Sequence, residues 1–520
     1  MQKPRKPQKL WEKKAQKLEQ QAQKLGEQPL SDDLNTNKQV LGQIFEGCDD
    51  VASRDFTIPT DPQTPVCLYL LKGAQDKTIV NDSIIAPLTN PEKALKCSIP
   101  DLVSAHQLQP ISTVEDAVSE VLNGMTVLLI HGSATAWAIN AKEAPVRGID
   151  EPEAQALVRG PRDGMIENLE TNLALVRKRL RTPSLKIATL TIGRRGNAGV
   201  AVLHIEGVAD PNVLKEVHAR LDKIDIDGIM DSGELEQLIE DNTISPFPQI
   251  GNTERPDNVA AALLNGRIAI MVDNSPFALI IPNVLTDMLQ ASDDHYERFY
   301  FASAIRFLRY ILSVIALTGP AAYVAITTFH HEMIPTTLLV TLIQARSGVP
   351  FPAVLEAGFM ELAFEALREA GLRLPKPIGQ AVSIVGALII GQAAVDAGLV
   401  SPIMVIVVAG TGIASFAIPA FNGAIVTRLL KFPFLVLAAL LGLYGVFLGF
   451  AILLIHLVSL RSFGVPYMSP LAPITLRDWK DLIVRLPTWA MSQRPSFIAK
   501  GGDTKRQVSD IRGVQPNEDS

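Results

Sequence analysis

The sequence predicts an α/β region of two related subdomains followed by an α-helical, multi-pass membrane domain. First, 47% of the 520 residues are hydrophobic, but the first part of the chain mixes charged and apolar side chains whereas residues 300–460 are strongly apolar. Second, two stretches align without a gap, Leu122–Asn140 and Leu264–Pro282. Third, two apolar segments stand in tandem, Ile378–Val395 and Pro402–Pro419. Each is close to the ~20 residues that a helix needs to cross a bilayer.

The chain begins with a basic stretch, residues 1–36, that is rich in Lys and Gln. We expect a solvated, disordered tail that touches anionic lipid headgroups. A short coiled coil is the alternative, but stable coiled coils need several heptads.

Cysteine usage indicates the compartment. The three cysteines are Cys48, Cys67 and Cys97, and all precede the apolar region. An odd number without a CxxC motif or a paired His spacing argues against a disulfide framework and against a zinc site. A reduced, cytoplasm-facing compartment fits best. The N-terminus has no apolar run, so we expect no secretory signal peptide and a cytoplasmic N-terminal half. The net charge of −6 says little about partners, and nucleic acid is not expected among them.

The two aligned stretches place one unit in residues 37–145 and a second in residues 185–292, joined by a linker and helix in residues 146–184. In each unit Asn-Gly ends a helix, with Gly in the left-handed conformation. A β-hairpin with a polar turn follows. The predicted strands are Val66–Leu71, Thr126–Ile130, Thr135–Ile139, Gly199–Ile205, Arg267–Val272 and Phe277–Ile281, and the predicted helices are Val114–Asn123, Met165–Leu180 and Asp257–Asn265.

The apolar run Ile268–Leu285 is thereby assigned to a hairpin and not to a membrane helix. Polar and helix-breaking residues, among them Asp273, Asn274 and Pro276, interrupt this run. They would be unfavourable inside a transmembrane helix.

Residues 293–460 form the predicted membrane domain, with four or five spans, and residues 461–520 a polar, basic tail. An Arg- and aromatic-rich collar, whose residue types favour the membrane interface, precedes the first span. Glu332–Ala345 is apolar but short for a span, and Pro350–Leu372 is an amphipathic helix. The predicted spans are Tyr310–Phe329, Ile378–Val395, Pro402–Pro419 and Phe432–Leu460.

Orientation is open. Three collar arginines, Arg298, Arg306 and Arg309, place the start of the first span inside by the positive-inside rule. If Glu332–Ala345 spans, which we expect, the C-terminal tail ends outside. If it does not, the tail is inside. The first case places six further basic residues inside and the second places them outside: Arg346, Arg368, Arg373, Lys376, Arg428 and Lys431.

Two motifs imitate metal sites. Lys223–Glu234 resembles a calcium loop, with Asp225, Asp227 and Glu234 at ligand positions. Its first position is Lys223, however, which repels a cation, so we expect a turn before a helix. His330-His331-Glu332 lacks the HExxH spacing because the last position is proline. These residues are expected as polar groups at a membrane boundary, and no metal is expected.

Motifs of catalysis are absent from the sequence. A nucleophile elbow, a phosphate loop and a dinucleotide fingerprint are all missing. We therefore expect neither an enzyme nor a cofactor.

A stripe of small or polar residues marks one side of Ile378–Val395. Its members are Gln380, Ser383, Ala387 and Gly391. A water-filled path would explain such a stripe, and close packing on another helix would explain it equally well.

Several long motifs resemble the A subunit of spore germinant receptors, the GerA family. They include HYERFYFASAIRFLRYI (His295–Ile311) and FHHEMIPTTL (Phe329–Leu338). The likeness also covers Ser245–Asn283 and Gly348–Pro402. Val158–Leu180 resembles the linker of the family, although Met165-Ile166 departs from its aromatic pattern. The resemblance extends over residues 150–480.

The resemblance implies a multi-pass protein of the spore inner membrane that triggers germination. It implies two partners, a transporter-like B subunit that binds the nutrient and a lipoprotein C subunit, in addition to membrane lipid. It also implies a homo-oligomer that forms a nutrient-gated cation channel. The stripe then lines a pore, with Ile384 and Leu388 beside it as a constriction and Asp396 at the mouth.

Two alternatives remain, a non-conducting signalling scaffold and a secondary transporter component. The transporter reading predicts inverted repeats within the membrane part. The sequence shows none there, because the duplication lies in the α/β region.

Overall fold

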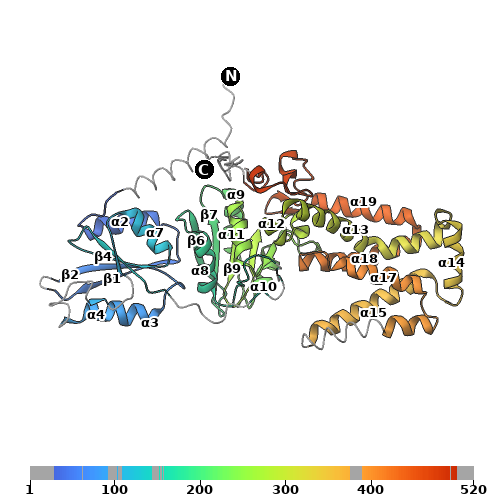
Figure 1. Ribbon diagram of the computed structural model, residues 1–520, viewed down its shortest axis with the longest axis horizontal. Helices are drawn as coiled ribbons and strands as arrows, with labels where there is room; N and C mark the ends of the chain where they lie inside the picture. The colour runs from blue at the N-terminus through green and yellow to red at the C-terminus, as the bar shows by residue number, and fades with distance from the viewer. Residues whose placement is uncertain are drawn as a thin grey trace, which may run out of the picture.

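The structure, a computed structural model, describes residues 28–60, 63–91, 102–103, 108–142, 151–152, 155, 157, 159–374, 389–491 and 493–499. Figure 1 shows an elongated molecule in which two α/β units lie side by side and a helical region extends from the second. The α/β region and the helical C-terminal region of the predicted fold class are therefore both present.

The first unit, which we call subdomain 1, is an antiparallel five-stranded sheet in the order β1-β2-β4-β5-β3. Helices cover both faces because successive residues of a strand point to opposite sides. Val127 and Leu129 of β4 pack under α2 and α7. Leu128 and Ile130 pack on the other face with the segment that contains α3, η1 and α4. The strands are β1 (Val51–Ile58), β2 (Thr64–Leu71), β3 (Leu108–Ile111), β4 (Thr126–Ile130) and β5 (Ala136–Ile139), and the helices are α2 (Leu34–Ile44), α3 (Lys77–Ile79), η1 (Val80–Ile85), α4 (Ala86–Thr89) and α7 (Val114–Leu122).

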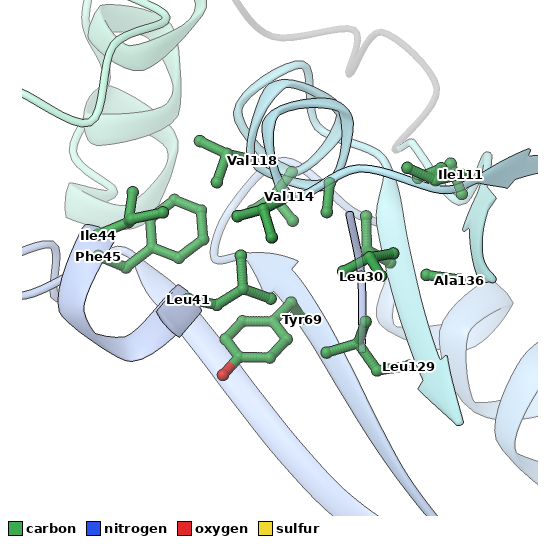
Figure 2. Packing of buried hydrophobic residues seen from close by; sticks show 14 of the residues in the cluster. Leu30, Leu41, Ile44, Phe45, Tyr69, Ile111, Val114, Val118, Leu129 and Ala136 are labelled. Atoms are coloured by element: carbon green, nitrogen blue, oxygen red, sulfur yellow. The ribbon is translucent and has the colours of Figure 1, made fainter. Parts of the chain in front are cut away.

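The start of subdomain 1 lies earlier in the chain than its predicted boundary. Helix α2 begins at Leu34, and Asp33 caps it by accepting the backbone N–H groups of Asn35 and Thr36. Leu30 is buried in the same core as Leu41 (Figure 2). Residues 28–36 of the predicted tail are thus folded, and residues 1–27 lie outside the described residues.

The second unit, subdomain 2, repeats this architecture. Its antiparallel sheet has the order β6-β7-β9-β10-β8, which is the order of subdomain 1 strand for strand. Helices α8 and α11 cover one face and α9 and α10 the other. The strands are β6 (Leu185–Ile192), β7 (Ala198–Ile205), β8 (Gly251–Thr253), β9 (Ile268–Val272) and β10 (Ala278–Ile281), and the helices are α8 (Leu169–Arg179), α9 (Pro211–Leu221), α10 (Ser232–Ile239), α11 (Pro256–Leu264) and η2 (Leu285–Leu289).

The predicted hairpin repeat is confirmed. Asn123 and Asn265 close α7 and α11, and the glycines that follow have φ of +81° and +94°. That conformation is costly for residues with a Cβ. Strands β9 and β10 pair as a hairpin, so Ile268–Leu285 contains no membrane helix.

A buried ion pair joins the two subdomains. Arg177 of α8 donates Nε and Nη2 to the carboxylate of Asp50 at 2.7 and 2.8 Å, and neither side chain is more than 2% exposed. The same guanidinium donates to the carbonyls of Thr182 and Leu185. Beside it, the backbone N–H of Ile187 donates to the carbonyl of Gly47. The chain before β1 thus covers the open edge strand β6.

We expect His204 of β7 to make subdomain 2 sensitive to acid. Burial, with the nearby charges of His218 and Lys186, lowers the pKa of His204 to about 4. The unfolded chain then binds more protons than the folded one between pH ~6.5 and ~4, so stability falls as the pH drops through this window. Between these two pH values, the free energy of unfolding of His204→Gln is expected to fall by up to about 3 kcal/mol less than that of the unsubstituted protein. Thermal unfolding of both proteins across this window tests it.

The comparison with His204→Gln is necessary because Glu236 titrates with the opposite sign. Burial raises its pKa to about 7, with smaller contributions from Glu240 and Asp231. Its contribution to stability is therefore lost as the pH rises. Equal pH dependence of both proteins would contradict the role of His204.

The helical region contains two helices that are long and apolar enough to cross a membrane, α13 and α18, among the described residues. Two further apolar helices, α17 and α19, are shorter. Residues 389–396 are helical as well. The helices are α12 (Asp293–Tyr296), α13 (Phe299–Phe329), η3 (His331–Met333), α14 (Thr336–Arg346), α15 (Ala353–Arg373), α17 (Pro402–Ser415), α18 (Phe421–Leu441) and α19 (Leu443–Ser459).

The predicted last span, Phe432–Leu460, is wrong as a single helix. Gly442 has φ +62° and breaks it, and α19 folds back on α18. Gly445 lies against Leu437, and the rings of Phe434 and Phe450 are 5.2 Å apart. Glycines allow this close approach.

The expected span at Glu332–Ala345 is also wrong. Helix α14 has 11 residues, or about 17 Å at 1.5 Å per residue, against ~30 Å of hydrocarbon. Figure 1 shows it crossing the end of the helical region that is farthest from the sheets.

Residues 461–499, which we call the C-terminal strap, return to subdomain 2. The hydroxyl of Tyr467 donates to the carbonyl of Pro248 at 3.0 Å, and the N–H of Leu285 donates to the carbonyl of Tyr467. The N–H of Phe463 donates to Asp241. The strap is thus folded, although the sequence predicted a polar tail from residue 461. It also contains β11 (Arg461–Ser462), β12 (Val465–Pro466), η4 (Leu476–Lys480) and η5 (Thr488–Ala490).

Candidate functional site

Three carboxylates of α15 lie in the middle of the apolar helices. Glu356 is 1% exposed and Glu361 is 2% exposed, and Glu365 is partly buried. The sequence indicated only an amphipathic helix here. Charged groups at such positions are costly unless they are paired, and they mark functional sites in membrane proteins.

Glu361 and Glu365 pair with cations of α18. Lys431 Nζ lies 3.3 Å from Glu361 Oε2, and Lys431 is buried. Arg428 donates Nε to Glu365 Oε2 at 2.9 Å and Nη2 to the same oxygen at 2.5 Å. Arg368, on α15 itself, reaches the other oxygen of Glu365 at 3.4 Å. These pairs hold α15 against α18.

Glu356 connects α15 to two further helices. Arg346, at the end of α14, places Nη2 3.1 Å from Glu356 Oε1. The other carboxylate oxygen accepts the backbone N–H of Ser401 at 2.9 Å. Ser401 is the N-cap of α17, whose positive end favours a carboxylate. One side chain therefore fixes where α14 and α17 meet α15.

We call the seven residues the charge ladder: Arg346, Glu356, Glu361, Glu365, Arg368, Arg428 and Lys431. Each carboxylate has a cation within 3.4 Å. Thr411 and Ser415 of α17 add hydroxyl contacts to Glu361 and Arg368. A compensated set of this kind holds helices in register.

The charge ladder also corrects the orientation argument. Four of the six basic residues that were counted as loop charges are its members. They are paired within the helical region and do not report on the side of a loop. One feature of the sequence could have predicted these pairs. Arg428 and Lys431 lie three residues apart in an apolar run, and another apolar helix carries glutamates at a similar spacing.

Of the predicted pore residues, the structure describes Gly391 and Asp396. Gly391 is buried, and a Cβ there would lie 3.5 Å from Val405 of α17, which fits the packing alternative at this position. Asp396 is exposed and accepts Gln392 Nε2 at 2.9 Å. The remaining pore residues lie outside the described residues, namely Gln380, Ser383, Ile384, Ala387 and Leu388.

Two collar arginines are buried instead of facing a membrane interface. Arg306 Nε lies 3.1 Å and Arg309 Nη1 3.0 Å from Asp294 Oδ2. Arg306 also pairs with Asp481 of the strap at 2.8 Å. Burial opposes the charged form of Asp294, but hydrogen bonding and the charges of both arginines outweigh it and lower its pKa. The collar thus ties α13 to the strap.

The calcium-like segment is held by arginines. Asp225 pairs with Arg194, and the carbonyl of Asp227 accepts the N–H groups of Arg195 and Gly196. Asp231 caps α10, as the predicted turn before a helix requires. Among the described residues no group of three or more His, Cys, Asp or Glu side chains is placed to hold a metal.

Calcium is expected not to bind this segment with the affinity of a sensor. Lys223 would repel the ion, and Glu234 already accepts the N–H of Met230 at 2.9 Å. Titration calorimetry on the purified protein tests this. Tight binding that Glu234→Gln abolishes would refute it.

Comparisons with known proteins identify the family. The family model described as Bacillus/Clostridium GerA spore germination protein matches residues 39–497. Spore germination protein KA of Bacillus subtilis is 45% identical over 468 residues, which are 89% of this chain and 86% of that protein. Spore germination protein A1 of the same organism is 43% identical, over 79% of this chain and 84% of that protein.

Two further similarities concern the membrane and the α/β region. The uncharacterized membrane protein YfkQ of Bacillus subtilis is 42% identical over 92% of this chain and 94% of that protein. The crystal structure of the N-terminal domain of the A subunit of the Bacillus megaterium spore germinant receptor GerK3 is 30% identical, with a TM-score of 0.37 over 49% of this chain and 96% of that chain. Since the family model covers most of the sequence, this chain belongs to the GerA family of spore germination proteins.

Proposed function

We propose that this protein is the A subunit of a nutrient germinant receptor of the spore inner membrane. The match of the family model over residues 39–497 carries the proposal. A transporter-like B subunit and a lipoprotein C subunit are its partners, as the family resemblance implies. Spores that lack the cognate B subunit are expected not to respond to the nutrient through this protein. A response in such spores would contradict the partnership.

The helical region is the membrane domain. Its outer surface carries large apolar side chains with at least two thirds of their area exposed, as a lipid-facing surface would: Ile406, Ile413, Leu440, Phe447 and Ile455. The strap contacts subdomain 2, so both lie on one side of the bilayer whatever the number of crossings. We assign that side to the cytoplasm.

The channel proposal rests on a ring of copies. One copy has too few helices to enclose a wide path, and ring symmetry repeats one helix face around the axis. That face must accept water without carrying an unpaired charge at the bilayer centre. We assign this role to Gln380, Ser383 and Ala387, since Gly391 packs against α17, with Ile384 and Leu388 as a constriction that closes by dewetting. Asp396, exposed at the end of the helical residues 389–396, would favour cations.

Two substitutions test the pore. Leu388→Ala removes bulk from the constriction and Ala387→Ser makes it wetter, so both are expected to give germination without nutrient. A residue that only packs against a helix would instead lose stability and function. Variants that accumulate normally, do not leak and keep their nutrient response would refute the pore. Electrical recording of the purified complex separates a channel from a scaffold or a transporter component.

A further inference from the structure

We propose that the C-terminal strap is a membrane-surface anchor, whose outer side inserts into the headgroup layer of the bilayer while its inner side holds α13 and subdomain 2. The proposal rests on the membrane assignment above. It adds a lipid-binding surface in a segment that has no spanning helix.

The depth of the strap follows from α13. This helix has 31 residues, or about 47 Å, which exceeds the ~30 Å hydrocarbon core by about 17 Å. The excess belongs to its first turns, because exposed aromatic side chains gather there, Phe299, Tyr300, Phe301 and Phe307, whereas Tyr310–Phe329 is uncharged. Exposed aromatic side chains are typical of the interface. The first turns of α13 therefore lie at headgroup level.

The strap runs beside these same turns. The backbone N–H of Arg485 donates to Ser303 Oγ at 3.0 Å, and Ser303 Oγ donates to the carbonyl of Arg485 at 3.2 Å. One turn further along, Arg306 Nη1 contacts Asp481 Oδ1 at 2.8 Å. Figure 1 shows this part of the chain at the junction of subdomain 2 and the helices. Residues 481–485 are thus held at the same depth as the start of α13.

The strap exposes large apolar side chains in addition to those that it buries. Five large apolar side chains between residues 474 and 489 are 40% to 73% exposed: Ile474, Leu476, Trp479, Val484 and Trp489. Arg477 and Lys480 are exposed among them. Amphipathic segments of this composition insert apolar groups below the phosphates while long basic side chains reach back to them. The continuity with the interface of α13 and this charge favour a bilayer over a second copy or a partner protein.

Tryptophan fluorescence tests the anchor directly. The chain has four tryptophans, so Trp11→Phe with Trp137→Phe leaves Trp479 and Trp489 as reporters. The full-length protein is reconstituted in vesicles whose lipids carry bromine, a quencher, either near the headgroup or near the end of the acyl chain. Bromine near the headgroup is expected to quench the reporters several-fold more than deep bromine. Leu476→Asp is expected to lower this quenching.

The matched control retains only Trp137, which packs against the core of subdomain 1. It is expected to show no quenching by either lipid. If the reporters are quenched no more strongly than this control, the anchor is wrong. A strap that is covered by protein would give that result. Alkaline extraction and flotation separate this failure from that of the membrane assignment. If the protein leaves the vesicles, both the membrane assignment and the anchor are wrong. If it stays but its reporters are not quenched, only the anchor is wrong.

Discussion

Lys431→Met is expected to abolish the nutrient response and to lower the amount of the protein in spore membranes. The substitution leaves the Glu361 carboxylate, 2% exposed, without its cation. Breaking one side of a buried ion pair costs about 3–5 kcal/mol, comparable to the whole stability of many domains. The thermal unfolding midpoint of the purified protein and its abundance in membranes measure the loss.

The double variant Glu361→Gln with Lys431→Met separates charge from shape. Removing both charges at once leaves no uncompensated carboxylate, so stability should return to near the starting value. Arg373→Met is the matched surface control, because Arg373 and Glu369 form a pair that is largely exposed. A Lys431→Met protein as stable as this control would refute the pairing of α15 with α18.

Arg177→Met is expected to have an effect of similar size at the junction of the subdomains. It leaves Asp50 buried without a cation and two carbonyls without their donor. The expected loss is again about 3–5 kcal/mol. Cys48 gives a local readout, because its thiol is buried against the carbonyl of Leu185 in the same junction.

Alkylation followed by mass spectrometry of the labelled peptides measures this opening. Arg177→Met should speed the labelling of Cys48 more than that of Cys67, which is buried inside the core of subdomain 1. Arg194→Met is the control, since its pair with Asp225 is exposed. Equal labelling of Cys48 in both variants would show that Arg177 does not hold the subdomains together.

Much of the α/β region could be predicted because its signals are local. Alternation of apolar residues marks a strand, and Asn-Gly marks the end of a helix. The aligned stretches Leu122–Asn140 and Leu264–Pro282 therefore gave the two hairpins. The folded residues before position 37 were missed because the composition of this stretch is that of a tail. Only the tertiary structure shows that Leu30 is buried in the core of subdomain 1.

The helical region shows the limit of composition. Hydropathy found the apolar segments, but it could not show that Gly442 folds α19 back on α18, because a glycine is as compatible with a straight span as with a break. Composition likewise assigned Arg428 and Lys431 to a loop, because a basic residue in an apolar chain is most often found outside the membrane. Their burial depends on glutamates more than sixty residues away.

The sequence alone determined the order of the regions, the duplicated hairpin and the family. Each of these depends on patterns among residues that are close together in the chain. The tertiary structure decided the charge ladder, the Asp50–Arg177 junction and the return of the strap to subdomain 2. The strap returns through hydrogen bonds between distant segments, such as that from Tyr467 to the carbonyl of Pro248. The physical reason is the same for the charge ladder and the junction. An ionic group in an apolar setting is stable only where a distant segment brings an opposite charge to it, and no periodicity within a segment records which partner that is.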